Sequence, residues 1–177
     1  RFNFIDEGEE MTATNVVVID YGIGNVFSVL RALEKLDVNV VLTSNPKKIM
    51  EANNVILPGV GAFGRAANRL ADMGLDRVIH EYVGTGKPFL GICVGMQLLL
   101  DVGEEFGEHA GLGIIPGRVR KLSAVDENGN AYRVPLIGWT AVEEARPGAW
   151  DDTPFSRQAG QNAFYFVHSY QAVVMDQ

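Results

Sequence analysis

The segment Gly91-Ile-Cys93-Val-Gly95 has the residue types and spacing of a catalytic turn. Glycines two positions before and two positions after a nucleophile remove side chains that would clash in a sharp strand-to-helix turn. Such a turn would expose the Cys93 sulfur, and a helix beginning at Val94 would favour its thiolate and offer N–H groups to an oxyanion. The alternative is a buried structural cysteine. The two glycines favour a nucleophile.

A second glycine-rich turn runs from Pro58 to Gly64. It matches G-x-G-x-x-G, but it does not follow the first predicted strand and no acidic residue ends the next one, so we expect no dinucleotide and no other cofactor. In hydrolases with such an elbow, a neighbouring loop supplies a second oxyanion donor. Gly59-Val60-Gly61 could do this beside Cys93. The plain alternative is a tight turn.

A nucleophilic cysteine needs a base, which is usually histidine, and the chain contains His80, His109 and His168. His80 lies beside an acid in a predicted helix, where we expect it to be solvated. His109 lies in an acidic loop, which favours a surface role. His168 ends an apolar run that would deliver it to a sheet edge. Spacing alone nominates His168 as the base, against a hydrogen-bonded core histidine.

An α/β pattern positions these candidates. The first half alternates four short apolar segments with amphipathic helical patterns, which predicts a doubly wound, mostly parallel sheet with ligands at the carboxyl ends of its strands. The predicted strands are Asn15–Asp20, Val38–Leu42, Asn54–Leu57 and Pro88–Ile92. Predicted helices follow an Asn25 cap, begin at Pro46, follow Gly64, and run from Val94 to Asp101.

The second half predicts antiparallel strands added to the same domain. They are Val119–Leu122, Tyr132–Ile137, Thr140–Val142, Ala163–Val167 and Ala172–Val174. We therefore expect one domain over residues 11–177, with residues 1–10 as an upstream extension.

Composition excludes several classes of partner. The net charge is −7, and the scattered Lys and Arg argue against binding to nucleic acid or an anionic membrane. The longest apolar stretch is shorter than the roughly 18 residues of a membrane span. The single cysteine allows no internal disulfide, and we expect a cytoplasmic protein without a metal site.

Several segments, in order, resemble the class I (triad) glutamine amidotransferases, and within them the glutaminase subunit of imidazole glycerol phosphate synthase. They are Asp20–Asn25, Leu57–Phe63, Phe89–Gln97, Gly111–Gly117, Val134-Pro135 with Gly138-Trp139, and Tyr165–Tyr170. The resemblance extends from Asn15 to Gln177. It implies the class I amidotransferase fold, with a flavodoxin-like core.

The resemblance also implies a reaction. Cys93 would attack the carboxamide carbon of glutamine, release ammonia and form a glutamyl thioester that water hydrolyses. Oxyanion donors would be the N–H groups of Val60 and Val94. The substrate-binding residues would be Gly59, Gly61, Gln97, Ser169 and Tyr170. Ammonia would pass through a tunnel to a (β/α)₈-barrel synthase subunit in histidine biosynthesis, with Asn25 and Trp139 toward that partner.

The sequence departs from the family in two places. The family's base lies in a His-Pro-Glu stretch, and its His-Ser-Tyr block binds substrate, so the resemblance moves His168 from base to binding. This chain has no His-Pro pair, and we expect the catalytic His and Glu beyond Gln177. Leu136 and Thr140 stand where the family has His and Asn.

These departures leave three alternatives open. One is a paralogous subunit that feeds ammonia into surface-sugar amidination. Another is a non-catalytic, partner-binding subunit, if the chain ends at Gln177. The third is an elbow-cysteine hydrolase or stress protein of flavodoxin-like topology that works without a partner.

Overall fold

A computed structural model describes residues 15–36, 38–125, 129, 131, 133–144, 146–151 and 163–175. The chain divides into two compact units. The first is the chain up to Arg120 together with the segment from Ala172 onward, and the second is Lys121–Gln171. The predicted extension, residues 1–10, lies outside the described residues, and the single domain stays a prediction.

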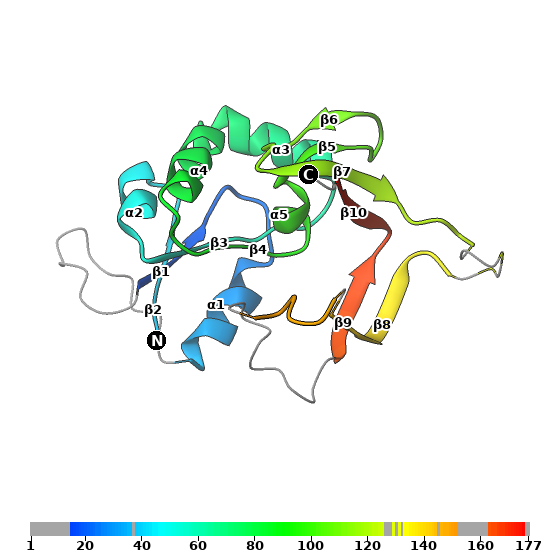
Figure 1. Cartoon of the computed structure of the whole chain (residues 1–177). Coiled ribbons are helices and arrows are strands. Elements are labelled where there is room, and N and C mark those ends of the chain that lie inside the picture. The colour runs from blue at the N-terminus through cyan, green and yellow to red at the C-terminus, as the bar shows by residue number, and fades with distance from the viewer. Residues whose placement is uncertain are drawn as a thin grey trace. The chain divides into compact units, whose positions relative to one another are not determined.

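The first unit is built on a parallel four-stranded sheet with strand order β2-β1-β3-β4 (Figure 1). The strands are β1 (Asn15–Ile19), β2 (Asn39–Thr43), β3 (Asn54–Leu57) and β4 (Phe89–Gly91). Every residue of β1 is buried, as expected for a strand covered on both faces. The strand order reverses between β1 and β3, so their carboxyl ends flank the switch point where ligands bind in such sheets.

Helices cover both faces of this sheet, which confirms the doubly wound prediction (Figure 1). On one face, α1 (Val26–Glu34) packs Leu30 against Val16, Val18 and Ile56. The other face carries α2 (Pro46–Glu51), α3 (Phe63–Asp72) and α4 (Leu75–Gly84). Within the described ranges, no helix combines the length and apolarity needed to cross a bilayer.

The starts of α1 and α2 follow from local sequence. The Asn25 side chain accepts a hydrogen bond from the Ser28 N–H, and the Asn45 side chain accepts one from the Lys47 N–H. Asparagine at the N-cap satisfies donors that have no partner inside the helix. Pro46 takes the first helical position, where its missing N–H costs nothing.

A second sheet has the order β10-β7-β5-β6. Its strands are β5 (Leu100–Gly103), β6 (His109–Ala110), β7 (Ile115–Lys121) and β10 (Tyr170–Val174). β5 pairs antiparallel with β6 but parallel with β7, so the added strands are mixed and not purely antiparallel.

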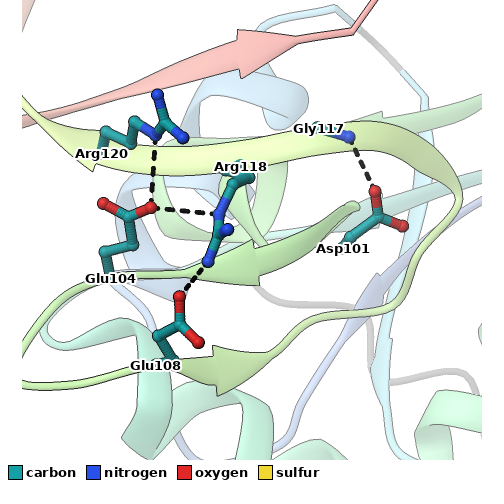
Figure 2. A network of polar contacts seen from close by, with 6 residues as sticks. All are labelled: Asp101, Glu104, Glu108, Gly117, Arg118 and Arg120. Atoms are coloured by element: carbon teal, nitrogen blue, oxygen red, sulfur yellow. Dashed lines mark hydrogen bonds and ion pairs between the residues drawn. The ribbon is translucent and has the colours of Figure 1, made fainter.

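Ion pairs cross the second sheet between β7 and the segment that follows β5 (Figure 2). Glu104 bridges Arg118 and Arg120, with its Oε1 3.0 Å and 3.2 Å from their respective Nε atoms, and Arg118 also contacts Glu108. The Asp101 carboxylate accepts a hydrogen bond from the Gly117 N–H at 2.8 Å. Together these contacts hold β7 in register beside β5.

The predicted helix Val94–Asp101 is wrong beyond its first turn. The helix α5 (Val94–Gln97) has four residues, and β5 begins at Leu100. The carbonyl groups of Leu98, Leu99 and Leu100 accept hydrogen bonds from the backbone of residues 112–115 and not from a longer helix. A short, buried apolar run is compatible with a helix or a strand. The hydrogen-bond partners of its backbone in the folded chain decide which of the two forms.

The second unit contains the antiparallel pair β8 (Leu136–Ala141) and β9 (Ala163–His168). The sequence predicted two strands here, separated at Gly138. Instead, every residue of β8 has a partner in β9, so one strand runs through the glycine. The ring of Trp139 meets that of Tyr165 edge-on, with 5.7 Å between ring centroids.

One prediction concerns the start of α3. Ala62, at its N-cap, makes no side-chain cap, but Glu105 Oε2 accepts a hydrogen bond from the Phe63 N–H at 2.8 Å. We expect Glu105→Ala to lower the free energy of unfolding by about 1 kcal/mol in urea denaturation, because a buried donor loses its acceptor. Glu81→Ala, on the exposed side of α4, is the control and should stay within about 0.5 kcal/mol. Equal losses would show that Glu105 does not act as a cap.

Candidate active site

Cys93 occupies the sharp turn between β4 and α5. Its backbone has φ +55° and ψ −118°, a region that residues with side chains rarely adopt. Strain of this kind persists only where the surrounding structure enforces it, and it is concentrated at functional sites. The cysteine is exposed and forms no disulfide. This is the geometry of a nucleophile elbow.

The two glycines that flank Cys93 are required by close backbone contacts. A Cβ on Gly91 would lie 2.5 Å from the Met96 Cα, and a Cβ on Gly95 would lie 1.9 Å from the Leu57 carbonyl oxygen. Real Cβ atoms do not approach so closely. The predicted reason for these glycines therefore holds, with the addition that Gly95 contacts a neighbouring strand.

The turn after β3 lies directly against this elbow. A Cβ on Gly59 would lie 2.4 Å from the Gly95 nitrogen and 2.9 Å from the Val94 carbonyl carbon. Only a bare backbone can pack this closely on the Val94–Gly95 peptide. The structure therefore brings together the two glycine-rich motifs, which are 32 positions apart when counted from Gly59 to Gly91.

The two predicted oxyanion donors occupy these two turns. Val94 is the first residue of α5, so its N–H has no partner inside the helix. Val60 follows Gly59 and is 47% exposed. The four-residue helix has no long macrodipole, so the expected electrostatic help to the Cys93 thiolate reduces to the N–H groups of one turn.

Tyr21 was not among the predicted site residues, yet it supports the same turn. Its side chain is fully buried, and its hydroxyl donates to the Pro58 carbonyl at 2.8 Å. Burial, and then the nearby negative charge of Cys93, raise the pKa of Tyr21 above its usual range. The sequence signal that could have identified Tyr21 was its position: it is an aromatic residue with a polar tip, directly after the predicted strand Asn15–Asp20.

The remaining predicted binding residues are divided between the two units. In the first unit, Gly61 has φ +85° with open space around it, and Gln97 is buried in α5. In the second unit, Ser169 lies in the turn between β9 and β10, and Tyr170 is the first residue of β10. The Ser169 carbonyl accepts a hydrogen bond from the Leu122 N–H at 2.9 Å.

The three histidines have separate environments. His80 is exposed on α4, as predicted. His109 is half-buried on β6, where its ring fills the space above Gly64, with ring atoms 2.7 Å from a would-be Cβ, and it also lines a groove beside α3. The surface role expected for it stays a prediction. His168 Nδ1 lies 2.9 Å from the Tyr170 carbonyl oxygen, and since a carbonyl only accepts, Nδ1 carries the proton. This contact keeps the His168 ring beside the turn between β9 and β10.

A groove of about 550 Å³ lies beside α3, and its lining does not include Cys93. Side chains of both charges line it, among them Arg65, Arg69, Asp72 and Glu105. We assign it no part in the chemistry of the elbow. Among the described residues, no three His, Cys, Asp or Glu side chains are grouped to hold a metal ion.

Comparison with known proteins agrees with this geometry. Residues 17–171 match the family model described as glutamine amidotransferase class-I, and the chain belongs to this family. The solved structure titled "Crystal structure of glutamine amidotransferase" has a TM-score of 0.60 at 16% identity, and covers 90% of this chain and 74% of that one. The "Structure of PurLQS from Thermotoga maritima" has a TM-score of 0.56 at 18% identity, with 92% and 70% covered.

Among curated proteins, the similar relatives carry a narrower name. The chain is 42% identical to "Imidazole glycerol phosphate synthase subunit HisH" of Geobacillus sp. (strain WCH70), over 90% of this chain and 73% of the relative. It is 44% identical to the subunit of the same name from Bacillus subtilis (strain 168), over 86% and 70%. The subfamily resemblance seen in the sequence therefore holds.

The backbone contact at the elbow yields a prediction. Gly95→Ala should lower the free energy of unfolding by about 1–3 kcal/mol, because the new methyl group overlaps the Leu57 carbonyl and the two turns must separate. Gly84→Ala is the matched control. Gly84 lies in α4 with nothing within 4 Å of its would-be Cβ, so this change should stabilise by up to about 1 kcal/mol. Chemical denaturation measures both, and an equal response would contradict the packing described here.

Proposed function

We propose that this chain is the glutaminase subunit of an imidazole glycerol phosphate synthase. It would hydrolyse glutamine to glutamate and ammonia, and the ammonia would serve a synthase subunit in histidine biosynthesis. Membership of the class-I amidotransferase family and 42–44% identity with the HisH subunits support this. The observation that carries the proposal is the exposed Cys93, held in a strained elbow against the Gly59–Val60 turn.

The first chemical step follows from this elbow. The Cys93 sulfur attacks the carboxamide carbon of glutamine while its proton passes to a base. The carbonyl oxygen then gains negative charge, and the N–H groups of Val60 and Val94 stabilise it by hydrogen bonds made to the tetrahedral species. Collapse of this species breaks the C–N bond, and the nitrogen takes up the proton and leaves as ammonia.

The second step hydrolyses the thioester. Water loses a proton to the base and attacks the glutamyl carbonyl carbon, and the same two N–H groups again receive the negative charge. Cleavage of the C–S bond releases glutamate and restores the thiol. We assign the base to none of His80, His109 and His168. Instead, the resemblance to the family assigns this role to the histidine of a His-Pro-Glu stretch.

Substrate binding would involve Gln97 and the residues Ser169 and Tyr170 at the turn from β9 to β10, as the family resemblance implies. Gly59 and Gly61 would leave room beside the oxyanion donors. The contact of His168 with the Tyr170 carbonyl and that of Leu122 with the Ser169 carbonyl hold this turn in shape. A preformed turn loses less entropy when substrate binds.

Two partner contacts are proposed, one on the exposed face of the β8–β9 pair in the second unit and one at Asn25 in the first. Trp139 is 73% exposed and stands opposite Tyr165, which is 57% exposed. Exposed aromatic pairs of this kind are typical of protein interfaces. We propose that a (β/α)₈-barrel synthase subunit covers them in a cytoplasmic heterodimer, whose barrel subunit carries the lyase step.

A second acceptor for ammonia remains a candidate. Leu136 and Thr140 stand where the family has His and Asn, and both lie on β8, the strand that carries Trp139, with side chains on the opposite face from it. Because two residues of this strand depart from the family, they favour testing a paralogous sugar-amidinating partner. Reconstitution with each type of barrel subunit distinguishes the two, since only the matching partner should stimulate glutamine hydrolysis.

The nucleophile is tested directly. We expect Cys93→Ala, in the full gene product with its synthase subunit, to lower glutamate release from glutamine by a factor on the order of 10³ or more, because no other group can form the thioester. His80→Ala, which changes an exposed residue of α4, should keep activity within about twofold. Unchanged hydrolysis in Cys93→Ala would refute the proposed function.

The oxyanion donor is tested by removing an N–H group. Val60→Pro should lower kcat for glutamine hydrolysis by about 10²–10³, because proline cannot donate a hydrogen bond. Val60→Ala retains the N–H and should lose less than about tenfold. Labelling of Cys93 by iodoacetamide serves as a check on the elbow. Similar kcat values in the two variants would show that Val60 supplies no donor.

A further inference from the structure

We propose that Tyr21 is a positioning residue for this reaction, whose hydroxyl holds the Pro58 carbonyl and thereby fixes the direction of the Gly59–Val60 peptide. The inference rests on the proposed function, because the Val60 N–H is there an oxyanion donor. It adds a residue from a third motif, the turn after β1, to the two that form the elbow.

The hydrogen bond of Tyr21 connects two strand ends. Its oxygen lies 2.8 Å from the Pro58 carbonyl oxygen. Tyr21 lies two residues after the end of β1 and Pro58 directly after β3, and these strands flank the switch point of the sheet. The side chain of Tyr21 is completely buried. With no water to replace the lost bond, removal of the hydroxyl leaves the Pro58 carbonyl without this partner.

The turn is fixed on two sides at Pro58–Gly59. Tyr21 binds the carbonyl, while the Cα of Gly59 rests on the Val94–Gly95 peptide. Beyond this point the turn is open, because Gly61 has nothing within 4 Å of its would-be Cβ. The direction of the Gly59–Val60 peptide therefore depends on the anchored peptide before it.

The charge state of Tyr21 suits this role. Burial and the negative charge of Cys93 both raise the pKa of the phenol, so it stays protonated at neutral pH and remains a donor. Its one hydrogen is directed at Pro58. The hydroxyl therefore acts through the turn and not by donating to the sulfur.

Arg69 holds the backbone of Tyr21 from the outside. Arg69 lies on the exposed side of α3, and its Nε donates a hydrogen bond to the Tyr21 carbonyl oxygen over 3.1 Å. This contact offers a second way to loosen Tyr21 that leaves the core unchanged. Arg69→Ala should lower kcat for glutamine hydrolysis, as loss of the Tyr21 hydroxyl does, but by a smaller factor.

Tyr82 provides a matched control. It is also fully buried, and its hydroxyl lies 3.3 Å from the Pro88 carbonyl oxygen and 3.4 Å from that of Ala52. Pro88 precedes β4, at the end of the strand opposite to the elbow. Tyr82→Phe therefore removes a buried hydroxyl bound to a proline carbonyl without touching the turn beside Cys93.

The kinetic test compares Tyr21→Phe with Tyr82→Phe in the full gene product bound to its synthase subunit. We expect Tyr21→Phe to lower kcat for glutamine hydrolysis about 10- to 100-fold, because a misdirected donor stabilises the transition state poorly. The KM of Tyr21→Phe should change by less than about threefold. In Tyr82→Phe, kcat and KM should each change by less than about threefold. Iodoacetamide labelling of Cys93 should keep its rate in Tyr21→Phe, since alkylation forms no oxyanion.

A second measurement does not depend on turnover. In ¹⁵N relaxation experiments, the order parameters of the Gly59 and Val60 amides should fall below about 0.85, the value of rigid backbone, in Tyr21→Phe but not in Tyr82→Phe. Arg69→Ala should shift them in the same direction. If Tyr21→Phe folds poorly, the order parameters of Arg69→Ala still test the inference.

Several results would overturn the inference. Equal kcat values in the two phenylalanine variants would do so, as would unchanged order parameters in Tyr21→Phe and Arg69→Ala. A changed labelling rate in Tyr21→Phe would show that Tyr21 acts on the thiol instead. If the wild-type complex releases no ammonia that depends on Cys93, the proposed function fails. The order parameters then still decide whether Tyr21 fixes the turn.

Discussion

The site depends on a contact between two stretches of backbone. The Cα of Gly59 rests on the Val94–Gly95 peptide, and the Cα of Gly95 rests on the Leu57 carbonyl. Side chains at these positions would force the turns after β3 and β4 apart. The contact brings the two turns that carry the predicted oxyanion donors together, directly after the strained backbone of Cys93. A strained turn persists only when surrounding packing enforces it, so packing and chemistry are inseparable here.

The rest of the first unit makes this contact rigid. β1 and β3 are buried between helices, and the Ile92 N–H donates to the Leu57 carbonyl, which fixes the end of β4 beside that of β3. The second sheet takes up the chain immediately after α5 and ends that helix after one turn. The elbow and its short helix therefore lie between two strands, β4 before them and β5 after them.

Membership in the class-I amidotransferase family gives this arrangement a chemical meaning. An exposed thiol beside backbone N–H groups suits acyl transfer from an amide, because such donors stabilise charge that appears only in the transition state. In the proposed mechanism, Tyr21 adds a contribution from the end of β1. The ends of three strands would then supply a nucleophile, an oxyanion donor and a support for that donor.

The sequence by itself determined the alternating strands and helices, the elbow at Cys93 and the need for glycine around it, because these follow from local periodicity and from sterics within a few residues. It could not determine the end of α5, since the buried run at Leu98–Leu100 fits a helix or a strand equally well. Nor could it reveal that β8 runs through Gly138, because strand pairing is a long-range choice. The tertiary structure alone decided that Gly59 packs on Gly95 and that the Tyr21 hydroxyl reaches Pro58. These contacts join residues more than thirty positions apart, and only the folded sheet brings them within bonding distance.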